Sequence, residues 1–446
     1  MKIYAPWEKV FNRIATPFEH FLHAQTTTGI VLMFMTILAL ILANTPLTET
    51  YAHFFHTKID LTVGSWSLSH TIHHWINDGL MAIFFFIIGL EIKREILVGE
   101  LSNIKVAILP ILAAIGGMVL PALIYLGINA GGEGASGWGI PMATDIAFAI
   151  SALVLLGNRV SPALVTFLVA LAIVDDLGAV IVIAVFYTDQ INMLPLGLAG
   201  VMFLIMIAFN RFGIHMILPY FLVGVFMWFF MLESGVHATI AGVIAAMAIP
   251  SKPKHRPIDF TNHTRNLLDE YDNYPIATDH MMHEKQKALL LNIKDRIDAV
   301  GTPAARLEHD LHLPVALIII PLFALANAGI SIDFSSIGTT IMQPVSLGII
   351  SGLIVGKVLG VAGVAWIAVK LGIAKLPEGS SMSQIFGVAF LAGIGFTMSI
   401  FVADLAFLGN DTLIFQAKVG ILAASLFAGV FGYVWLRYVA KGSEVK

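Results

Sequence analysis

The sequence predicts an all-α polytopic membrane protein, because it is unusually apolar and poor in charge. Of its 446 residues, 58% are hydrophobic and only 12% are charged, and the mean hydropathy is +0.86. Soluble domains carry about 25% charged residues, so this chain cannot coat a water-facing surface of its size. The composition excludes an ordinary soluble enzyme, a disordered chain and a nucleic-acid-binding protein. The absence of cysteine excludes disulfides, thiolate metal sites and a cysteine nucleophile.

Twelve apolar segments are candidates for transmembrane helices. A span needs about 17–25 apolar residues, and several of these segments are short. Short spans tilt little or are covered by neighbouring helices. The predicted spans are residues 25–43, 75–90, 106–128, 135–156, 163–187, 192–209, 214–231, 235–250, 313–330, 345–370, 385–407 and 415–437.

The placement of Lys and Arg tests this set of spans. With the N-terminus in the cytoplasm, the cytoplasmic segments hold 22 of the 25 Lys and Arg residues. The opposite side holds only Lys58, and Lys357 and Lys418 lie within spans. This asymmetry is the positive-inside signature of membrane proteins, and one span too many or too few would scramble it. We therefore expect both termini to be cytoplasmic.

Three segments lie outside the spans. Residues 1–24 mix aromatic and charged side chains, which predicts an N-terminal interfacial helix. Residues 58–69 alternate around a Gly-Ser pair, which predicts a β-hairpin on the outer side, with a flexible loop as the equal alternative. A lone hairpin is marginally stable, so it would pair with something, such as another protomer. Residues 251–312 are polar and charged and predict a cytoplasmic loop insertion, partly disordered, with helical spacing over 283–300.

The predicted organisation follows from these boundaries. Spans 1–8 occupy 25–250, spans 9–12 occupy 313–437, and a cytoplasmic tail covers 438–446.

Four ionisable residues sit in apolar sequence and are the most informative feature of the chain. They are Asp145, Asp175, Asp176 and Lys357. Each costs about 2.5–3.5 kcal/mol at the centre of a membrane helix. They must therefore be paired, protonated or hydrated in a cavity. One structural ion pair accounts for one Asp and the Lys, and it leaves two carboxylates over.

Asp175 and Asp176 are neighbours within the fifth predicted span. Consecutive helical side chains point about 100° apart, so one can face a partner helix while the other faces a cavity. Burial and mutual proximity raise the proton affinity of carboxylates, and oxygen ligands suit a hard cation. The pair therefore indicates a site that takes either a proton or a cation, and a purely structural role is the alternative.

Two spans are interrupted. Gly137, Gly139 and Pro141 do not extend a regular helix, so the chain is expected to break just before Thr144. Asp145 would then cap the new helix N-terminus or coordinate an ion.

Gly393 and Gly395 give span 385–407 a matching irregularity. Close helix packing also explains two glycines. Spans 3–5 start inside and spans 10–12 start outside, so they fit an inverted repeat with the breaks in their middle members. Transporters built this way bind ions at the membrane midplane.

Eight motifs resemble the NhaA family of sodium/proton antiporters, in family order over nearly the whole chain. They are NDGLMAIFFFIIGLEIKREI (77–96), MATDIAFAI (142–150), ALAIVDDLGAVIVIAVFY (170–187), SGVHATIAG (234–242), RLEHDLH (306–312), PLFALANAG (321–329), GKVLG (356–360) and GIGFTMSIF (393–401). The resemblance implies twelve helices with an inverted repeat and two crossed, broken helices.

The resemblance also implies an activity. Cytoplasmic Na⁺, and also Li⁺, would exchange for external H⁺ by alternating access in the bilayer of a bacterial inner (plasma) membrane. Exchange would be electrogenic and pH-regulated. The protein would be a transporter rather than an enzyme and would need no cofactor.

The resemblance assigns roles to the ionisable residues. Asp176 would be the main Na⁺ and H⁺ carboxylate, and Asp175 would exchange its pairing with Lys357 as the ion binds. Thr144 and Asp145 would lie at the crossing of the broken helices, whose interruptions are at Pro141, Gly393 and Gly395. The implied cytoplasmic funnel and pH-response residues are Glu91, Arg94, Glu95, Glu308, His309, His312 and His237. Asp78 would be an acid on the outer side, and hairpin 58–69 would be the contact of a homodimer.

Read without the family, several of these residues have simpler explanations. Glu91, Lys93, Arg94 and Glu95 fit the end of a span at the interface, and the two histidines of RLEHDLH fit a surface helix. His237 fits a core histidine with a satisfied hydrogen bond as well as a functional one. Asp404 and Glu233 fall outside the family pattern, and Asp404 is either a further charge in the cavity or an interface residue.

Three rival functions are compatible with buried acids. An intramembrane aspartyl protease needs two catalytic acids, but its Gly-x-Gly-Asp pattern is absent from the sequence. A sodium-coupled symporter of an organic anion usually clamps the carboxylate with Arg, and no Arg lies in the interior of the predicted spans. A channel is disfavoured by the two broken helices, which are typical of carriers.

Overall fold

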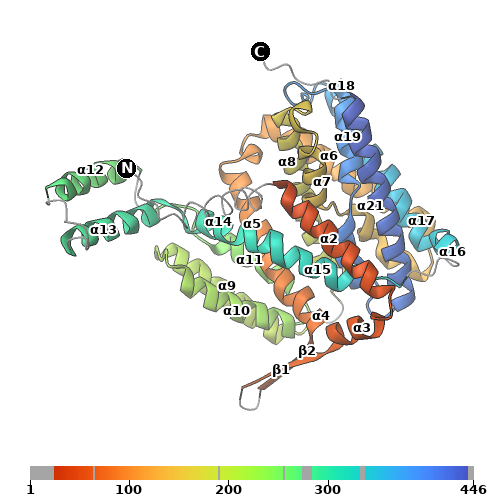
Figure 1. Ribbon diagram of the computed structural model, residues 1–446, viewed down its shortest axis with the longest axis horizontal. Coiled ribbons are helices and arrows are strands. Elements are labelled where there is room, and N and C mark those ends of the chain that lie inside the picture. Colours follow the sequence, from red (N-terminus) through yellow and green to blue (C-terminus); the bar gives the residue numbers. More distant parts are fainter. Residues whose placement is uncertain are drawn as a thin grey trace, which may run out of the picture.

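The structure, a computed structural model, describes residues 25–63, 66–188, 191–254, 257–273, 284–331 and 337–439. The predicted interfacial helix at 1–24 and most of the predicted tail lie outside the described residues. The fold is a helical bundle with one two-stranded sheet, and the α class predicted from composition is confirmed (Figure 1).

The first part of the chain holds the hairpin and the helices that carry the acid pair. Its elements are α2 (Gln25–Ala43), α3 (Thr48–His56), β1 (Lys58–Val63), β2 (Trp66–Thr71), α4 (Ile72–His74), η1 (Trp75–Leu80), α5 (Met81–Leu97), η2 (Glu100–Ser102), α6 (Ile104–Asn129), η3 (Glu133–Met142), α7 (Ile146–Val154), η4 (Gly157–Arg159), α8 (Pro162–Phe186), α9 (Met193–Arg211), α10 (Ile217–Glu233) and α11 (Thr239–Ala248).

The second part holds the insertion and the helices that carry the buried lysine. Its elements are α12 (Pro257–Asp272), α13 (Glu284–Val300), α14 (Pro303–Pro314), η5 (Val315–Ile319), α15 (Ile320–Asn327), α16 (Ile337–Ile341), α17 (Pro344–Ser351), η6 (Gly352–Gly356), η7 (Leu359–Gly363), α18 (Val364–Lys370), α19 (Met382–Ala392), α20 (Phe396–Ala406) and α21 (Asp411–Val439).

Helices lie at every segment that the sequence predicts to span the membrane. In the described part of the chain, eight segments are long and apolar enough to cross a membrane, or nine if the bent pair α19 and α20 is one span. Helices α10 and α11 are shorter, at 17 and 10 residues. The count of twelve spans therefore stays a prediction, whereas the multi-pass architecture is confirmed.

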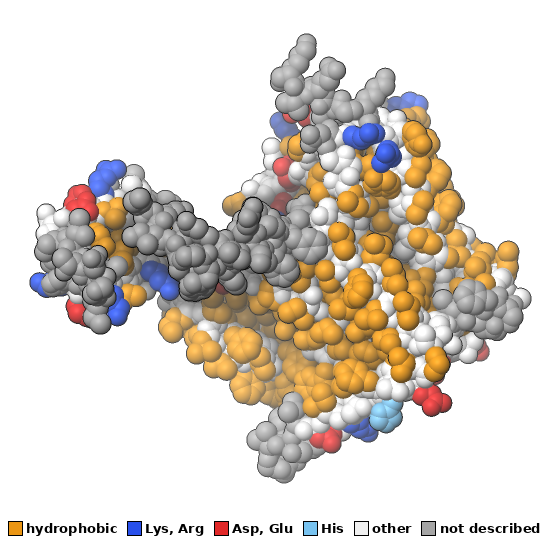
Figure 2. Space-filling model, in the orientation of Figure 1, with side chains coloured by type: hydrophobic (Ala, Val, Ile, Leu, Met, Phe, Trp, Pro, Cys, Tyr) orange, Lys and Arg blue, Asp and Glu red, His pale blue; other side chains and the backbone are white. Residues whose placement is uncertain are grey.

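Large apolar side chains cover the outside of the bundle, as expected of a surface in contact with lipid. Figure 2 shows them over the broad middle of the visible face, with charged side chains toward its edges. On α9, for example, Leu194 is 76% exposed and Leu204 is 64% exposed.

Both predicted helix breaks are present. The 3₁₀ segment η3 ends at Met142, residues 143–145 are extended or irregular, and α7 starts at Ile146. Helices α19 and α20 meet at Gly393 to Gly395 with a bend of 46°. The backbone bond from the Asp145 N–H to the Ile394 carbonyl, at 2.6 Å, joins the two breaks directly. The broken helices therefore cross at their interruptions.

A row of glycines lets the segment that carries Lys357 approach α6. Gly352, Gly356 and Gly360 are spaced by four, and η6 and η7 are π-helical turns on either side of Lys357. A Cβ on Gly356 would lie 2.6 Å from the Pro121 Cα, and one on Gly360 would overlap the backbone of Gly116. Only glycine allows two backbones to pack this closely.

The hairpin prediction is confirmed, and the hairpin is slightly longer than expected. Strands β1 and β2 pair antiparallel from Lys58 opposite Thr71 to Val63 opposite Trp66. The turn residues themselves lie outside the described residues.

The insertion forms two helices, α12 and α13, that project away from the bundle (Figure 1). The helical spacing predicted at 283–300 matches α13. One boundary differs, because α14 begins at Pro303 and runs through η5 into α15, whereas the predicted span begins at 313. The Thr302 hydroxyl caps this helix by accepting from the Ala305 N–H at 3.2 Å. Hydropathy misses the first turns because they are charged.

The glycine contacts predict a stability difference within one segment. The substitution Gly360→Ala should lower the free energy of unfolding by about 1–3 kcal/mol, because its Cβ would overlap backbone. The matched control is Gly363→Ala in the same segment, whose Cβ would have no atom within 4 Å. Thermal unfolding in detergent measures both, and equal midpoints for the two variants would contradict the packing argument.

Candidate ion-binding site

The acid pair lies in the middle of α8. Ser161 caps this helix by accepting from the Leu164 N–H at 3.2 Å, and Pro162 occupies its first position. Asp175 and Asp176 follow in the helix interior, each with 1% of its surface exposed. A capped N-terminus and an apolar sequence thus form a regular helix that buries both carboxylates.

Asp175 is paired with a base from the second half of the chain. The Lys357 ammonium contacts Asp175 Oδ2, and both side chains are fully buried. Lys357 Nζ also donates to Thr144 Oγ1 at 2.9 Å. The Thr144 hydroxyl lies 2.6 Å from Asp175 Oδ2 and 2.8 Å from the Ala392 carbonyl, so it donates to one of these two oxygens. The cluster joins α8, the first break and the lysine segment.

Asp145 caps two helices at once. Its Oδ1 accepts from the Phe148 N–H of α7 at 3.1 Å. Its Oδ2 accepts from the Thr397 N–H at 3.0 Å and from the Thr397 hydroxyl at 2.5 Å, at the start of α20. A carboxylate near two helix N-termini is stabilised by their unpaired N–H groups and dipoles. The capping role considered from the sequence is therefore present in the structure.

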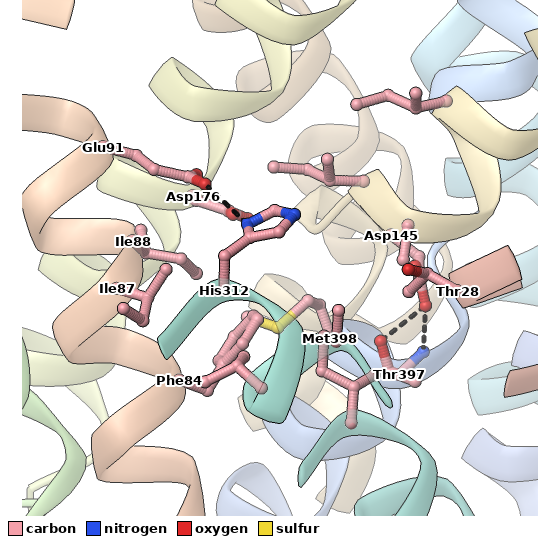
Figure 3. A pocket seen from close by; sticks show the side chains of 16 residues that line it. Thr28, Phe84, Ile87, Ile88, Glu91, Asp145, Asp176, His312, Thr397 and Met398 are labelled. Atoms are coloured by element: carbon pink, nitrogen blue, oxygen red, sulfur yellow. Dashed lines mark hydrogen bonds and ion pairs between the residues drawn. The ribbon is translucent and has the colours of Figure 1, made fainter. Parts of the chain in front are cut away.

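A cavity of about 170 Å³ lies between these elements (Figure 3). Asp176 and Asp145 line it from α8 and from the first break, and Thr28, Thr397 and Met398 also line it. Asp176 differs from Asp175 because it has no ion-pair partner among the described residues. Oδ1 of each acid is buried and has no hydrogen-bond partner in the described part of the chain.

The sequence-predicted funnel residues gather where α5 meets α14. Glu91 and His312 line the cavity, with Glu91 Oε1 and His312 Nδ1 4.0 Å apart (Figure 3). Arg94 bonds Glu95 Oε1 at 2.9 Å and lies 3.3 Å from Glu308 Oε1. A mixed group of acids and bases therefore lies beside the cavity, with Glu91 and His312 in its wall.

Three predicted residues lie apart from this cavity. His309 is exposed on α14. The His237 ring bonds the Tyr187 carbonyl at 2.7 Å, at the end of α8. Asp78 pairs with His74 at 3.1 Å and lines a second cavity of about 290 Å³ beside the hairpin end of α5.

Neither residue outside the family pattern lines the first cavity. Asp404 forms an ion pair of 3.2 Å with Lys418 of α21 and lines the second cavity. Glu233 is exposed at the end of α10.

Sequence reasoning missed Thr397, whose backbone and hydroxyl both bond Asp145. The signal was present, because a hydroxyl residue lies two positions after the Gly-x-Gly interruption in GIGFTMSIF. A free N–H and a hydroxyl at a new helix start attract a carboxylate.

The arrangement suits reversible binding of a small hard cation. Two carboxylates and the hydroxyls beside them offer oxygen atoms, which Na⁺-like ions prefer. A buried carboxylate without a counter-charge is costly, so Asp176 requires a proton or a cation. Of the two neighbouring acids, Asp175 therefore has its charge balanced within the protein, whereas the charge of Asp176 must be balanced from outside.

Comparison with known proteins identifies the family. The chain matches the family model described as Na+/H+ antiporter 1 over residues 19–436. It is 72% identical to the Na(+)/H(+) antiporter NhaA of Sulfurimonas denitrificans, over 100% of both chains. It is 49% identical to Na(+)/H(+) antiporter NhaA 1 of Saccharophagus degradans, over 97% of this chain and 93% of the relative. The corresponding protein of Dichelobacter nodosus is 47% identical over 99% and 95%. The chain therefore belongs to the Na+/H+ antiporter 1 family, as its motifs predict.

Proposed function

We propose that this protein exchanges Na⁺ from the cytoplasm for H⁺ from outside, with Asp176 as the carboxylate for which the two ions compete. The observation that carries the proposal is Asp176 itself, which is buried, lines a cavity and lacks an ion-pair partner in the described part of the chain. Membership of the antiporter family supports the choice of ions. Binding of one ion excludes the other, and this exclusion couples the two fluxes.

The ion pair of Lys357 and Asp175 would link Na⁺ binding to a change within the protein. In the structure the lysine neutralises Asp175. A Na⁺ ion that binds both aspartates would compete with the ammonium for Asp175, so that binding at Asp176 and breaking of the pair are linked. Thr144 touches both members of the pair and would hold them in place while the partner changes.

The crossing of the broken helices would supply the remaining support. Asp145 caps both helix starts and lines the cavity, so a cation near it would change the electrostatics of the crossing. Glu91, Arg94 and Glu95, with Glu308 and the nearby histidines His309 and His312, would attract cations to the cytoplasmic mouth and make exchange depend on pH.

The finer features of the activity follow from the same site. Li⁺ should also be carried, because it is a small hard cation.

The protein would lie in a bacterial inner membrane with both termini cytoplasmic, as the Lys and Arg asymmetry indicates. If more protons enter than Na⁺ ions leave, the cycle is electrogenic, and each net charge gains about 2.3 kcal/mol per 100 mV.

The substitution Asp176→Asn should abolish exchange, because an amide neither releases a proton nor balances a cation. Purified protein in liposomes with an internal pH dye and added Na⁺ measures this. The matched control is Glu133→Gln, an exposed acid at the start of η3, which should exchange like wild type. Undiminished Na⁺-driven proton flux through the Asp176→Asn variant would refute the assignment.

The substitution Lys357→Met should lower the free energy of unfolding by about 3–5 kcal/mol, because it leaves Asp175 as a buried charge without its partner. The double variant Asp175→Asn with Lys357→Met should recover most of this loss, since both charges are then gone. Thermal unfolding in detergent compares the two. A double variant as unstable as the single one would contradict the pairing argument.

The hairpin is proposed as the contact of a homodimer. Its ends are joined by the bond from the Ile72 N–H to the Thr57 carbonyl at 2.9 Å, so a short Gly-Ser linker can replace residues 58–71 without opening the bundle. The shortened protein should be monomeric by light scattering in detergent and keep Na⁺/H⁺ exchange. A dimer of unchanged stability would show that another surface holds the copies together.

A further inference from the structure

The cytoplasmic half of α5 carries a lysine that the proposed exchange does not yet use. Lys93 lies two residues beyond Glu91 and is half-buried. Its Nζ donates to the carbonyls of Met247 at 2.8 Å and Ala246 at 3.4 Å, and it also contacts the Ile249 carbonyl. One ammonium therefore bonds three backbone oxygens of a different element.

These oxygens belong to the C-terminal end of α11. The last carbonyls of a helix have no intrahelical donor, and the helix dipole favours a cation there. Asn210, at the end of α9, donates to the Ala248 carbonyl at 2.8 Å. Lys93 and Asn210 together provide donors for the carbonyls of residues 246 to 249. The cap of α11 is thus built from two neighbouring helices.

Helices α5 and α11 are also in close backbone contact, and they lie side by side in Figure 1. A Cβ on Gly89 would lie 2.7 Å from the Ala246 Cβ and 3.1 Å from the Val243 Cα. A Cβ on Gly242 would lie 2.8 Å from the Phe86 N. Contacts this close hold the two helices against each other.

The contacts of α5 with α14 are weaker. Glu91 and His312 are 4.0 Å apart, and Arg94 and Glu308 are 3.3 Å apart with the Arg94 side chain 48% exposed. Exposed ion pairs typically contribute about 0–1 kcal/mol. Charge-assisted bonds from a half-buried ammonium are stronger. Among the polar contacts of this half of α5, those on the α11 side are therefore the stronger.

We propose that Lys93 is a positioning residue for the cation path. By capping α11 from α5, it fixes the cytoplasmic half of α5 and so holds the Glu91 carboxylate in the wall of the cavity that Asp176 also lines. It thereby sets the affinity for Na⁺ that arrives from the cytoplasm. The inference rests on the proposed exchange function.

Two substitutions at Lys93 and one control test the proposal. Lys93→Met removes the donor that α5 supplies to the end of α11, and Lys93→Arg keeps a cation with several donors. Asn210→Ala removes the donor that α9 supplies and leaves α5 unchanged. Initial exchange rates in liposomes are measured against Na⁺ on the cytoplasmic face, and they are scaled to the amount of folded protein. This separates KM from the maximal rate.

Lys93→Met should raise the KM for Na⁺ about threefold or more with a nearly unchanged maximal rate, because only ion capture is weakened. Lys93→Arg should restore a KM close to wild type. Asn210→Ala should lower thermal stability and leave KM unchanged. If Lys93→Met does not fold, Lys93→Gln, which keeps a donor but loses the charge, takes its place under the same expectation.

A wild-type KM in Lys93→Met, or in Lys93→Gln where it takes its place, would overturn the role of Lys93 and leave the exchange function standing. An equal rise in KM for Asn210→Ala would also overturn it, because the stability of α11 would then explain the effect. Absence of exchange in the wild-type protein under the same conditions would instead refute the proposed function.

Discussion

The buried contact between Lys357 and Asp175 is the constraint on which the rest of the site depends. Neither charge is tolerable alone at zero exposure, because desolvation costs several kcal/mol per ion. The contact therefore ties α8 to the lysine segment between η6 and η7 and draws Thr144 into the same cluster. With Asp175 satisfied in this way, its neighbour Asp176 is left to face the cavity with a charge that the protein does not balance.

At the crossed breaks, the ends of two helices need hydrogen-bond partners, and one side chain supplies several of them. Backbone that leaves a helix inside a bilayer must find hydrogen bonds within the protein. Asp145 supplies acceptors to both helix starts, and the backbone bond from its own N–H to Ile394 joins the two interruptions. The residue that stabilises the crossing also lines the cavity. Structural support and ion chemistry are therefore difficult to separate here, and a change at Asp145 would affect both.

Much of this arrangement could be predicted from the sequence because charge in an apolar context has few explanations. The cost of burying Asp175, Asp176 and Lys357 already required a pair and a cavity. Glycine and proline at the interruptions predicted the broken helices, and alternation predicted the hairpin.

The remaining features depend on partners that are distant in the sequence. Thr397 matters because it lies opposite Asp145, and Lys93 matters because the end of α11 lies beside it. The start of α14 was missed for a different reason. Its first turns are charged, so a search for apolar segments begins the span only after them. Local composition contains neither the geometry of the crossing nor the identity of a neighbouring helix end.

The row of glycines beside Lys357 limits how the molecule can rearrange. Where Gly356 and Gly360 meet α6, main chain packs directly on main chain, and few side-chain atoms lie between them. Sliding at this seam would force backbone atoms into one another, so α6 and the lysine segment must travel as one rigid piece. The movement that turns the cavity from one side of the membrane to the other must take place at softer boundaries, where side chains interdigitate and can be repacked.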